Sequence, residues 1–490
     1  MAAKIRADGF KVSILDETLL QESKTTLIDY LTDVSIVGIS GHITQHNIML
    51  QTAKKVKEIN SSIINVLGGP HPTLTKALLM KDANVDFIIQ GEGEIAFSEL
   101  INRLEENRPI KDIAGLIFRE KGNVQINPPK DIENLDELPI PAFDLSKLDE
   151  YYELFMKKFD TLGNITYPRA YRIPVESSRG CPVACNFCCA KTVIGSTWRA
   201  KSPTRLLEEI SRIEELFPKI FNLKETYLTY VDNNFTTSKK RVKEFCRLKK
   251  ESKYDISWAA LSRATEIDYE LVKIMVDAGF TATFIGGESG NLNSLIHMGK
   301  KYKDDSTINA VKACIKAEVK RIIVSFIVGL PYEDISAIKK TLKYAYDIRE
   351  LAPRNVIISV YKATPYPSTS FWGEMEEAGK LSPDFEKYDL LLKEGLVFDH
   401  PIFGFEAVEL DKLLNLWNSI SSLKYLNLSL IDQQFKPLQI VRPLQYLLKR
   451  LKSMGINPSL KISSVTQIEE TQLIQQINNQ IRELEEFIFK

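Results

Sequence analysis

The stretch Glu176-Ser-Ser-Arg-Gly-Cys181-Pro-Val-Ala-Cys185-Asn-Phe-Cys188-Cys189 decides how the rest of the chain is understood. Three of its cysteines have the spacing C-x3-C-x2-C, directly after a strand-like run. Three thiolates on one short loop can hold three irons of a 4Fe–4S cube and leave the fourth iron open. Structural zinc is the competing interpretation, but it needs four ligands, usually as two pairs, and no second Cys or His pair has a suitable spacing. We therefore predict a cluster held by Cys181, Cys185 and Cys188, and packing roles for Cys189, Cys246 and Cys314.

Composition limits what the chain can be. Its 490 residues suffice for several domains, and 44% hydrophobic with 26% charged residues is typical of a globular protein. Lys+Arg and Asp+Glu both number 64, so there is no global basic field and we expect no nucleic-acid partner. The sequence has neither an apolar run long enough to span a bilayer nor an apolar signal core, which predicts a cytoplasmic protein without a transmembrane segment. A tight cysteine cluster in such a chain indicates metal or redox chemistry rather than a disulfide framework.

Residues 1–115 alternate strand-like and helical patterns. Apolar runs lie at 11–15, 34–39, 63–67 and 85–89, and the last three are followed by glycine-bearing turns. This order predicts an open, Rossmann-like parallel sheet, whose ligands lie at the carboxyl ends of the strands. The small residues at those ends are Ser40, Gly68, Gly69, Gly91 and Gly93.

The remaining chain divides into three further parts. The pattern of 116–168 predicts a connector, with a hairpin about Gly122 and then proline-rich, extended pieces. Residues 169–380 contain six strand-like runs separated by helical patterns, at 171–177, 226–231, 256–261, 280–285, 322–328 and 355–360. Six βα units predict a partial, TIM-like (βα)6 barrel with its chemistry at the C-terminal strand ends. Residues 381–490 are predicted to be a helical domain, with an apolar stripe at Leu473, Ile477, Ile481, Leu484 and Ile488.

The cysteine spacing, with the aromatic Phe187 before the third cysteine, resembles the signature of the radical S-adenosylmethionine superfamily. The resemblance covers most of residues 1–380. It implies that the open iron chelates the amino and carboxylate groups of S-adenosylmethionine, and that reductive cleavage releases a 5′-deoxyadenosyl radical that abstracts hydrogen from a substrate. The protein would supply placement and exclusion of water.

Other positions are similar to sites of the same family. Gly286-Gly287-Glu288 resembles the G-x-E motif that contacts the ammonium of S-adenosylmethionine, while Ser325 and Gly329 resemble the segment beside the adenine. Arg263 is placed like an arginine that pairs with the cofactor carboxylate, and a solvated surface arginine is the alternative. Asp232 is expected to face the same barrel mouth, and residues 361–367 resemble a substrate-side loop.

The front domain resembles the cobalamin-binding domain of class B radical methylases and anaerobic oxidative cyclases, on the motifs at 68–73 and 91–94. The D-x-H-x-x-G motif that supplies a histidine to cobalt elsewhere is absent, and we interpret His42 and His71 as hydrogen-bonding groups. In that family a further strand precedes the helix that leads into 7–12. We therefore expect a sheet without its first strand, either because the start codon is assigned too far downstream or because the strand has been lost.

The leading functional hypothesis is a cobalamin-dependent radical methyltransferase that acts on an unactivated carbon of a small or hydrophobic metabolite. An external reductant of flavodoxin or ferredoxin type is implied. A radical cyclase or oxidative rearrangement enzyme of the same architecture is the alternative. A methylthiotransferase ranks lower because it needs three more cysteines in the front domain, and no cysteine precedes Cys181. A non-catalytic metal-binding protein on a barrel scaffold would not cleave S-adenosylmethionine.

Overall fold

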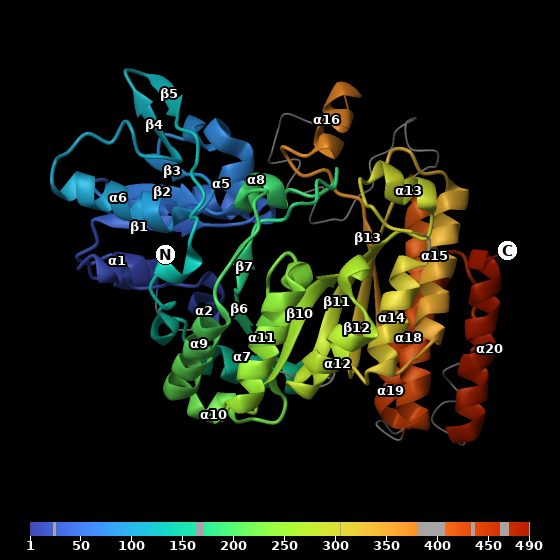
Figure 1. Cartoon of the computed structure of the whole chain (residues 1–490). Coiled ribbons are helices and arrows are strands. Elements are labelled where there is room, and N and C mark those ends of the chain that lie inside the picture. Colours follow the sequence, from blue (N-terminus) through green and yellow to red (C-terminus); the bar gives the residue numbers. More distant parts are fainter. Residues whose placement is uncertain are drawn as a thin grey trace.

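The structure is a computed structural model that describes residues 1–22, 26–162, 171–303, 305–379, 381, 407–432, 437–460 and 470–489. A front sheet, a sheet of six parallel strands and a group of C-terminal helices follow one another along the chain (Figure 1). The predicted α/β fold class is therefore confirmed. The chain also contains the helices α1 (Ala2–Ala7), α2 (Glu17–Glu22), α3 (Leu27–Tyr30), α5 (Pro70–Thr75), α7 (Leu148–Leu162), α8 (Ala190–Ile194), α10 (Pro218–Phe221), α13 (Leu292–His297) and α16 (Ser370–Glu377).

The front sheet has the order β1-β2-β3-β4-β5. Its parallel strands are β1 (Ile36–Ser40), β2 (Ile64–Gly68) and β3 (Phe87–Ile89), and the predicted hairpin, β4 (Leu116–Glu120) and β5 (Asn123–Ile126), extends it in antiparallel fashion. Successive side chains point to opposite faces, so Leu67 packs in one core with Met49 of α4 (His46–Ile59), and Val66 packs in another with Leu100 of α6 (Gly93–Glu105). Helices thus cover both faces, as in other doubly wound sheets.

The predicted strand at 11–15 is wrong. These residues follow α1 without forming a helix or strand, and Ile14 in their middle is 42% exposed. The intrinsic preference of residues for a strand is weak unless the strand pairs with a neighbour and buries one face, and this run does neither. The described sheet therefore begins at β1.

The second sheet has the order β13-β12-β11-β10-β9-β6, with all neighbours parallel. All six predicted strands are confirmed: β6 (Tyr171–Val175), β9 (Thr226–Tyr230), β10 (Ser257–Arg263), β11 (Phe280–Glu288), β12 (Arg321–Val328) and β13 (Val356–Lys362). The intervening helices are α9 (Pro203–Leu216), α11 (Lys239–Glu251), α12 (Tyr269–Asp277), α14 (Ser306–Lys316) and α15 (Ile335–Glu350). Four of them begin at a capping side chain that accepts a backbone hydrogen bond, namely Ser202, Ser238, Asp268 and Asp334.

The C-terminal helices are α18 (Ala407–Ile431), α19 (Pro437–Ser453) and α20 (Glu470–Phe489), and they stand beyond the β13 end of the second sheet (Figure 1). The predicted stripe of α20 is buried at all five positions. It belongs to the same apolar core as the barrel. The part of the predicted helical domain at 382–406 lies outside the described residues. Within the described chain, none of the helices is long and apolar enough to cross a membrane.

Candidate active site at the carboxyl ends of the strands

The cysteine loop follows β6 and the short strand β7 (Ser178–Arg179), which pairs with β8 (Arg199–Ala200). Gly180 enters the loop with a φ of +83°, and a Cβ atom there would lie 2.1 Å from the Thr197 carbonyl oxygen. Only glycine fits this approach. The far side of the loop rests on the turn after α13, where Asn186 donates its backbone N–H to the Met298 carbonyl at 3.1 Å. The loop is therefore held at both ends.

The predicted cluster ligands all lie on this loop as free thiols, with Cys181 and Cys185 partly buried and Cys188 exposed. Burial raises the pKa of Cys185 to about 11. Among the described residues, three or more Cys, His, Asp or Glu side chains do not converge into a metal-binding group. What the loop does supply is three soft sulfur donors on one short segment, the kind of ligand that iron–sulfur clusters use. Cys246 and Cys314 are fully buried in the core.

Three of the residues predicted to contact S-adenosylmethionine lie side by side across neighbouring strands. Arg263 of β10 is in register with Gly286 of β11, and Gly286 is in register with Ser325 of β12. The chain is crowded at Gly287, where a Cβ atom would lie 3.0 Å from side chains of Thr307 and Val324. The structure therefore brings these residues to one place at the carboxyl ends of the strands, where the chemistry of such barrels lies.

Glu288 is buried and paired with a residue that the sequence did not single out. Its carboxylate lies 2.8 Å from Lys300 Nζ, with the two side chains only 10% and 8% exposed. Burial alone would lower the pKa of Lys300, but the charge of Glu288 raises it above the ordinary value. Lys300 Nζ also lies 6.0 Å from the ring centre of Phe187, on the cysteine loop. The pair thus links the G-x-E segment to that loop.

Arg263 and Gly329 differ in what they can still bind. Arg263 Nε is buried without a hydrogen-bond partner, although the guanidinium reaches Glu266 at 3.4 Å. The Gly329 N–H is already engaged, because it donates to Glu333 Oε2 at 2.8 Å. Glu333 is 1% exposed, and burial raises its pKa. Arg263 therefore has a donor left for a ligand, whereas Gly329 shapes the turn.

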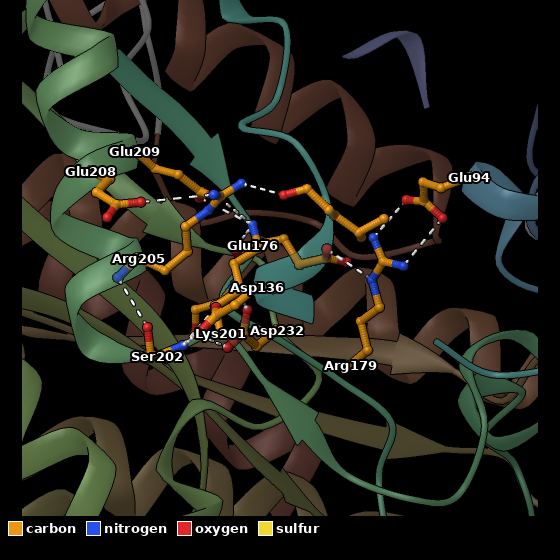
Figure 2. Close-up of polar contacts among 12 residues, drawn as sticks. Glu94, Asp136, Glu176, Arg179, Lys201, Ser202, Arg205, Glu208, Glu209 and Asp232 are labelled. Carbon is orange, nitrogen blue, oxygen red and sulfur yellow. Dashed lines mark hydrogen bonds and ion pairs between the residues drawn. The ribbon is translucent and has the colours of Figure 1, made fainter. Parts of the chain in front are cut away.

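Asp232 does not face the mouth, contrary to the prediction. It is 1% exposed and accepts hydrogen bonds from the Ser177 N–H at 2.7 Å and the Ser178 hydroxyl at 2.7 Å. Figure 2 shows Asp232 close to Lys201, and Lys201 forms a buried ion pair with Glu209 at 2.8 Å. A buried carboxylate needs such donors, and here they come from the chain entering the loop.

The predicted residues of the front sheet meet at its carboxyl edge. Ser40 is in register with Gly68, and a Cβ atom at Gly69 would lie 2.5 Å from Ser40 Oγ. The Gly91 N–H bonds to Thr73 Oγ1 at 3.0 Å, and Gly93 is the first residue of α6. The crowding at Gly69 leaves little room for side chains at this edge, which suits the close approach of a large planar ligand.

Of the two histidines predicted as hydrogen-bonding groups, His71 is the one whose ring contact the structure gives. His71 is fully buried, and its Nε2 lies 2.8 Å from His46 Nδ1. Burial and the nearby His46 lower the pKa of His71 to about 3, so the ring is neutral. The backbone of His42 donates to Gln45 Oε1 at 2.8 Å.

Ion pairs join the front sheet to the cysteine loop, and the sequence alone did not indicate them. Figure 2 shows Glu94 of the front domain beside Arg179, at 2.7 Å, just before the first cysteine. Glu92 pairs with Arg199 at 2.8 Å, and these two side chains are 3% and 7% exposed. We call these four residues the junction. Helix α5 also contacts α8, which follows the cysteines. The carboxyl edge of the front sheet and the cysteine loop therefore lie next to each other.

Comparisons with known proteins agree with this arrangement. Residues 175–345 match the Radical SAM superfamily, and residues 1–101 match the B12 binding domain. An uncharacterized methyltransferase of Pyrococcus horikoshii is 33% identical over 345 residues, which cover 69% of each chain. The anaerobic magnesium-protoporphyrin IX monomethyl ester cyclase of Synechocystis sp. is 26% identical, over 78% of this chain and 72% of the cyclase.

Among solved structures, the radical S-adenosylmethionine methyltransferase TsrM of Kitasatospora setae shares the fold. The TM-score is 0.63 at 15% identity, over 78% of this chain and 73% of that one. The family carries a 4Fe–4S cluster, S-adenosylmethionine and, through the front domain, cobalamin. The sequence relationship, the two matched domains and the shared fold lead to one conclusion: this chain is an enzyme that belongs to the radical S-adenosylmethionine superfamily, in the group with a B12-binding domain before the barrel.

Proposed function

We propose that this enzyme transfers a methyl group to an unactivated carbon of a small-molecule substrate. The observation that carries the proposal is the junction, because it holds the carboxyl edge of the front sheet and the cysteine loop next to each other. A methyl transfer that uses both cofactors needs them within reach of the same substrate atom. The similarity to a methyltransferase of Pyrococcus horikoshii supports the same reaction.

Three sets of residues would hold the cofactors. The proposed cluster ligands are Cys181, Cys185 and Cys188. The proposed contacts for S-adenosylmethionine lie at the ends of β10, β11 and β12, and they are Arg263, Gly286, Gly287, Glu288, Ser325 and Gly329. The proposed contacts for cobalamin lie at the front edge, and they are Ser40, Gly68, Gly69, Gly91 and Gly93. When bound, the cluster supplies an electron for cleavage of S-adenosylmethionine to a 5′-deoxyadenosyl radical, and cobalamin supplies a site that carries a methyl group.

The chain's own residues bind, orient and exclude water. Lys300 holds the Glu288 carboxylate at 2.8 Å, and this carboxylate would also accept a hydrogen bond from the ammonium group of the cofactor. Arg263 Nε offers a buried donor for the cofactor carboxylate. The junction and the buried residues below the loop keep bulk water away from this side of the mouth.

A radical cyclisation is the second candidate, and the similarity to the Synechocystis cyclase favours it. The two reactions differ in their adenosine products. A methyltransferase that uses S-adenosylmethionine as methyl donor releases S-adenosylhomocysteine together with 5′-deoxyadenosine, whereas a cyclase releases only 5′-deoxyadenosine.

We further propose a cytoplasmic location and a reductant of flavodoxin or ferredoxin type. All six cysteines are free thiols, which suits a reducing compartment. Cys188 is exposed, so the loop offers one thiol at the surface, toward an external electron donor.

The test is anaerobic reconstitution with iron, sulfide and cobalamin, followed by mass spectrometry of the adenosine products with reduced flavodoxin. We expect 5′-deoxyadenosine to form, and S-adenosylhomocysteine to accompany it when a substrate is methylated. Cys185→Ala is expected to lose both iron and cleavage activity. Cys189→Ser is the matched control, since this neighbouring thiol lies outside the spacing, and it is expected to retain both. Equal iron in the wild type and Cys185→Ala would contradict the cluster assignment.

A further inference from the structure

A cavity of about 890 Å³ lies at the other end of the barrel, away from the cysteine loop. Its walls include the first residues of five strands, Thr226, Ser257, Thr281, Arg321 and Val356, or their neighbours. Helices α18 and α19 close its remaining side, in line with their position beyond β13 in Figure 1. None of the cofactor residues proposed above lines it.

Positive charge dominates the described lining of this cavity. Six basic side chains line it, and Glu225 is the one acidic residue among the described lining residues. The basic residues are Lys224, Lys320, Arg321, Arg349, Arg354 and Arg450. Only Arg354 has a carboxylate partner in the described chain, Asp432 at 2.6 Å.

Arg349 is the most informative of these residues. It is 8% exposed, and among the described residues its guanidinium has one hydrogen-bond partner, the Ser421 carbonyl at 3.4 Å. The acidic residues nearest in the ion-pair network, Glu350 and Glu485, are engaged by Lys424 at 2.9 and 3.1 Å. A buried charge without an ion pair is costly, so its presence in a cavity wall indicates an anion that is bound there in the working state.

The shape of the cavity adds a second requirement. It follows β13 from Val356 to Tyr361, a length of about 17 Å at about 3.3 Å per residue. Apolar side chains such as Ile358, Val360 and Leu447 line this path. Ser359 on it is in register with Ser325, one of the proposed cofactor contacts. The cavity therefore extends from a floor lined by basic residues to the level of the proposed S-adenosylmethionine contacts.

We propose that this cavity binds an elongated, largely apolar molecule by a carboxylate or phosphate group at its end, with Arg349 and Arg321 as the anion-binding residues. The identification of this cavity as the substrate site rests on the proposed function. The binding of an anionic, apolar molecule in the cavity does not depend on that function. The anionic end would lie at the base, and the apolar body would follow β13 toward the cofactors. Such a substrate presents unactivated carbons, which are the carbons that need a radical.

The test is calorimetric titration of the anaerobically purified holoenzyme with dodecyl phosphate, without reductant. Dodecanol and dodecyltrimethylammonium test whether binding requires the negative charge. Inorganic phosphate tests whether binding requires the apolar chain. Dodecyl phosphate is expected to bind at least about tenfold more tightly than dodecanol and dodecyltrimethylammonium, because an ionic hydrogen bond adds about that factor. It is expected to exceed inorganic phosphate by at least about the same factor, because burial of the alkyl chain adds affinity. Equal binding of dodecyl phosphate and dodecanol, or of dodecyl phosphate and inorganic phosphate, would overturn the proposal.

Variants locate the site. Arg349→Gln and, independently, Arg321→Gln are expected to weaken dodecyl phosphate about tenfold and leave dodecanol unchanged. Arg212→Gln is the matched control, because this partly exposed arginine of α9 lies outside the cavity. If the Arg349→Gln variant does not fold, the affinity of the Arg321→Gln variant alone tests the proposal, because Arg321 lies at the half-buried rim of the cavity. Unchanged affinity in a folded Arg321→Gln variant would overturn the proposal. Since the titration needs no cleavage of S-adenosylmethionine, failure of the proposed reaction would leave its result intact.

Discussion

The two ends of the barrel differ in whether their buried positive charges are paired with carboxylates. At the carboxyl ends of the strands, Arg179, Arg199 and Lys300 each have a carboxylate partner within 2.8 Å, and all are largely buried. At the amino ends, Arg349 is equally buried but has no ion pair among the described residues. Paired buried charges fix one geometry, whereas an unpaired one needs a ligand. The difference separates charges that the protein pairs by itself, at the carboxyl ends, from a charge at the amino ends that a ligand would pair.

The largest effect is expected for Lys300→Met. It leaves Glu288 buried without its partner, which should reduce the free energy of unfolding by about 3–5 kcal/mol. Denaturant unfolding of the anaerobic protein measures this, with Lys273→Met as the control because its pair with Asp277 is solvent-exposed and contributes little to stability. Glu288→Gln combined with Lys300→Met should recover part of the loss. Equal stability of Lys300→Met and Lys273→Met would show that burial does not strengthen the pair of Lys300 with Glu288.

The junction should give the next largest effect. Arg179→Met leaves Glu94 without its main partner, and we expect a loss of about 2 kcal/mol or more. A double-mutant cycle with Glu94→Gln should give a coupling energy of about 1.5 kcal/mol or more. Limited proteolysis at the boundary of the front domain reports the same loosening. Additive effects of the two substitutions would show that the pair does not join the two parts.

Acid should weaken the junction. Burial alone would raise the pKa of Glu94, but the hydrogen bond and charge of Arg179 lower it below its ordinary 4.5. A carboxyl with a lowered folded-state pKa contributes stability above pH 4.5, and this contribution is lost as the pH falls through the folded pKa. Wild type should therefore exceed Glu94→Gln in melting temperature at pH 7, and the gap should narrow in acid. A gap that is constant from pH 7 to the acid limit would contradict this.

The smallest effect is expected at the other end of the barrel. Arg349→Met removes a buried charge that has no ion pair, so the free energy of unfolding should stay within about 1 kcal/mol of wild type or rise. Burial lowers the pKa of Arg349 despite the nearby Glu350, which is consistent with a charge held at a cost. The measurement is the same denaturant unfolding, without added ligand. A loss as large as that of Lys300→Met would mean that this charge is compensated after all.

Local patterns predicted much of this molecule. The six barrel strands, their helices and the buried stripe of α20 follow from periodicity and capping within short windows of sequence. The same holds for the cysteine spacing and for the glycines that crowd the strand ends, since each signal lies within a few residues. The run at 11–15 failed because strand formation also needs a neighbour, which a local pattern does not contain.

The sequence by itself determined the family, the cofactor class and the order of the elements, because these depend on residues that are close along the chain. Only the tertiary structure decided which charges are paired. Arg179 contacts Glu94, 85 positions away in the sequence, and Asp232 contacts Ser177, 55 positions away. Arg349 has no carboxylate partner among the residues that the structure describes. Pairing depends on distance in space and on burial, and both arise only when the two sheets and the C-terminal helices pack together.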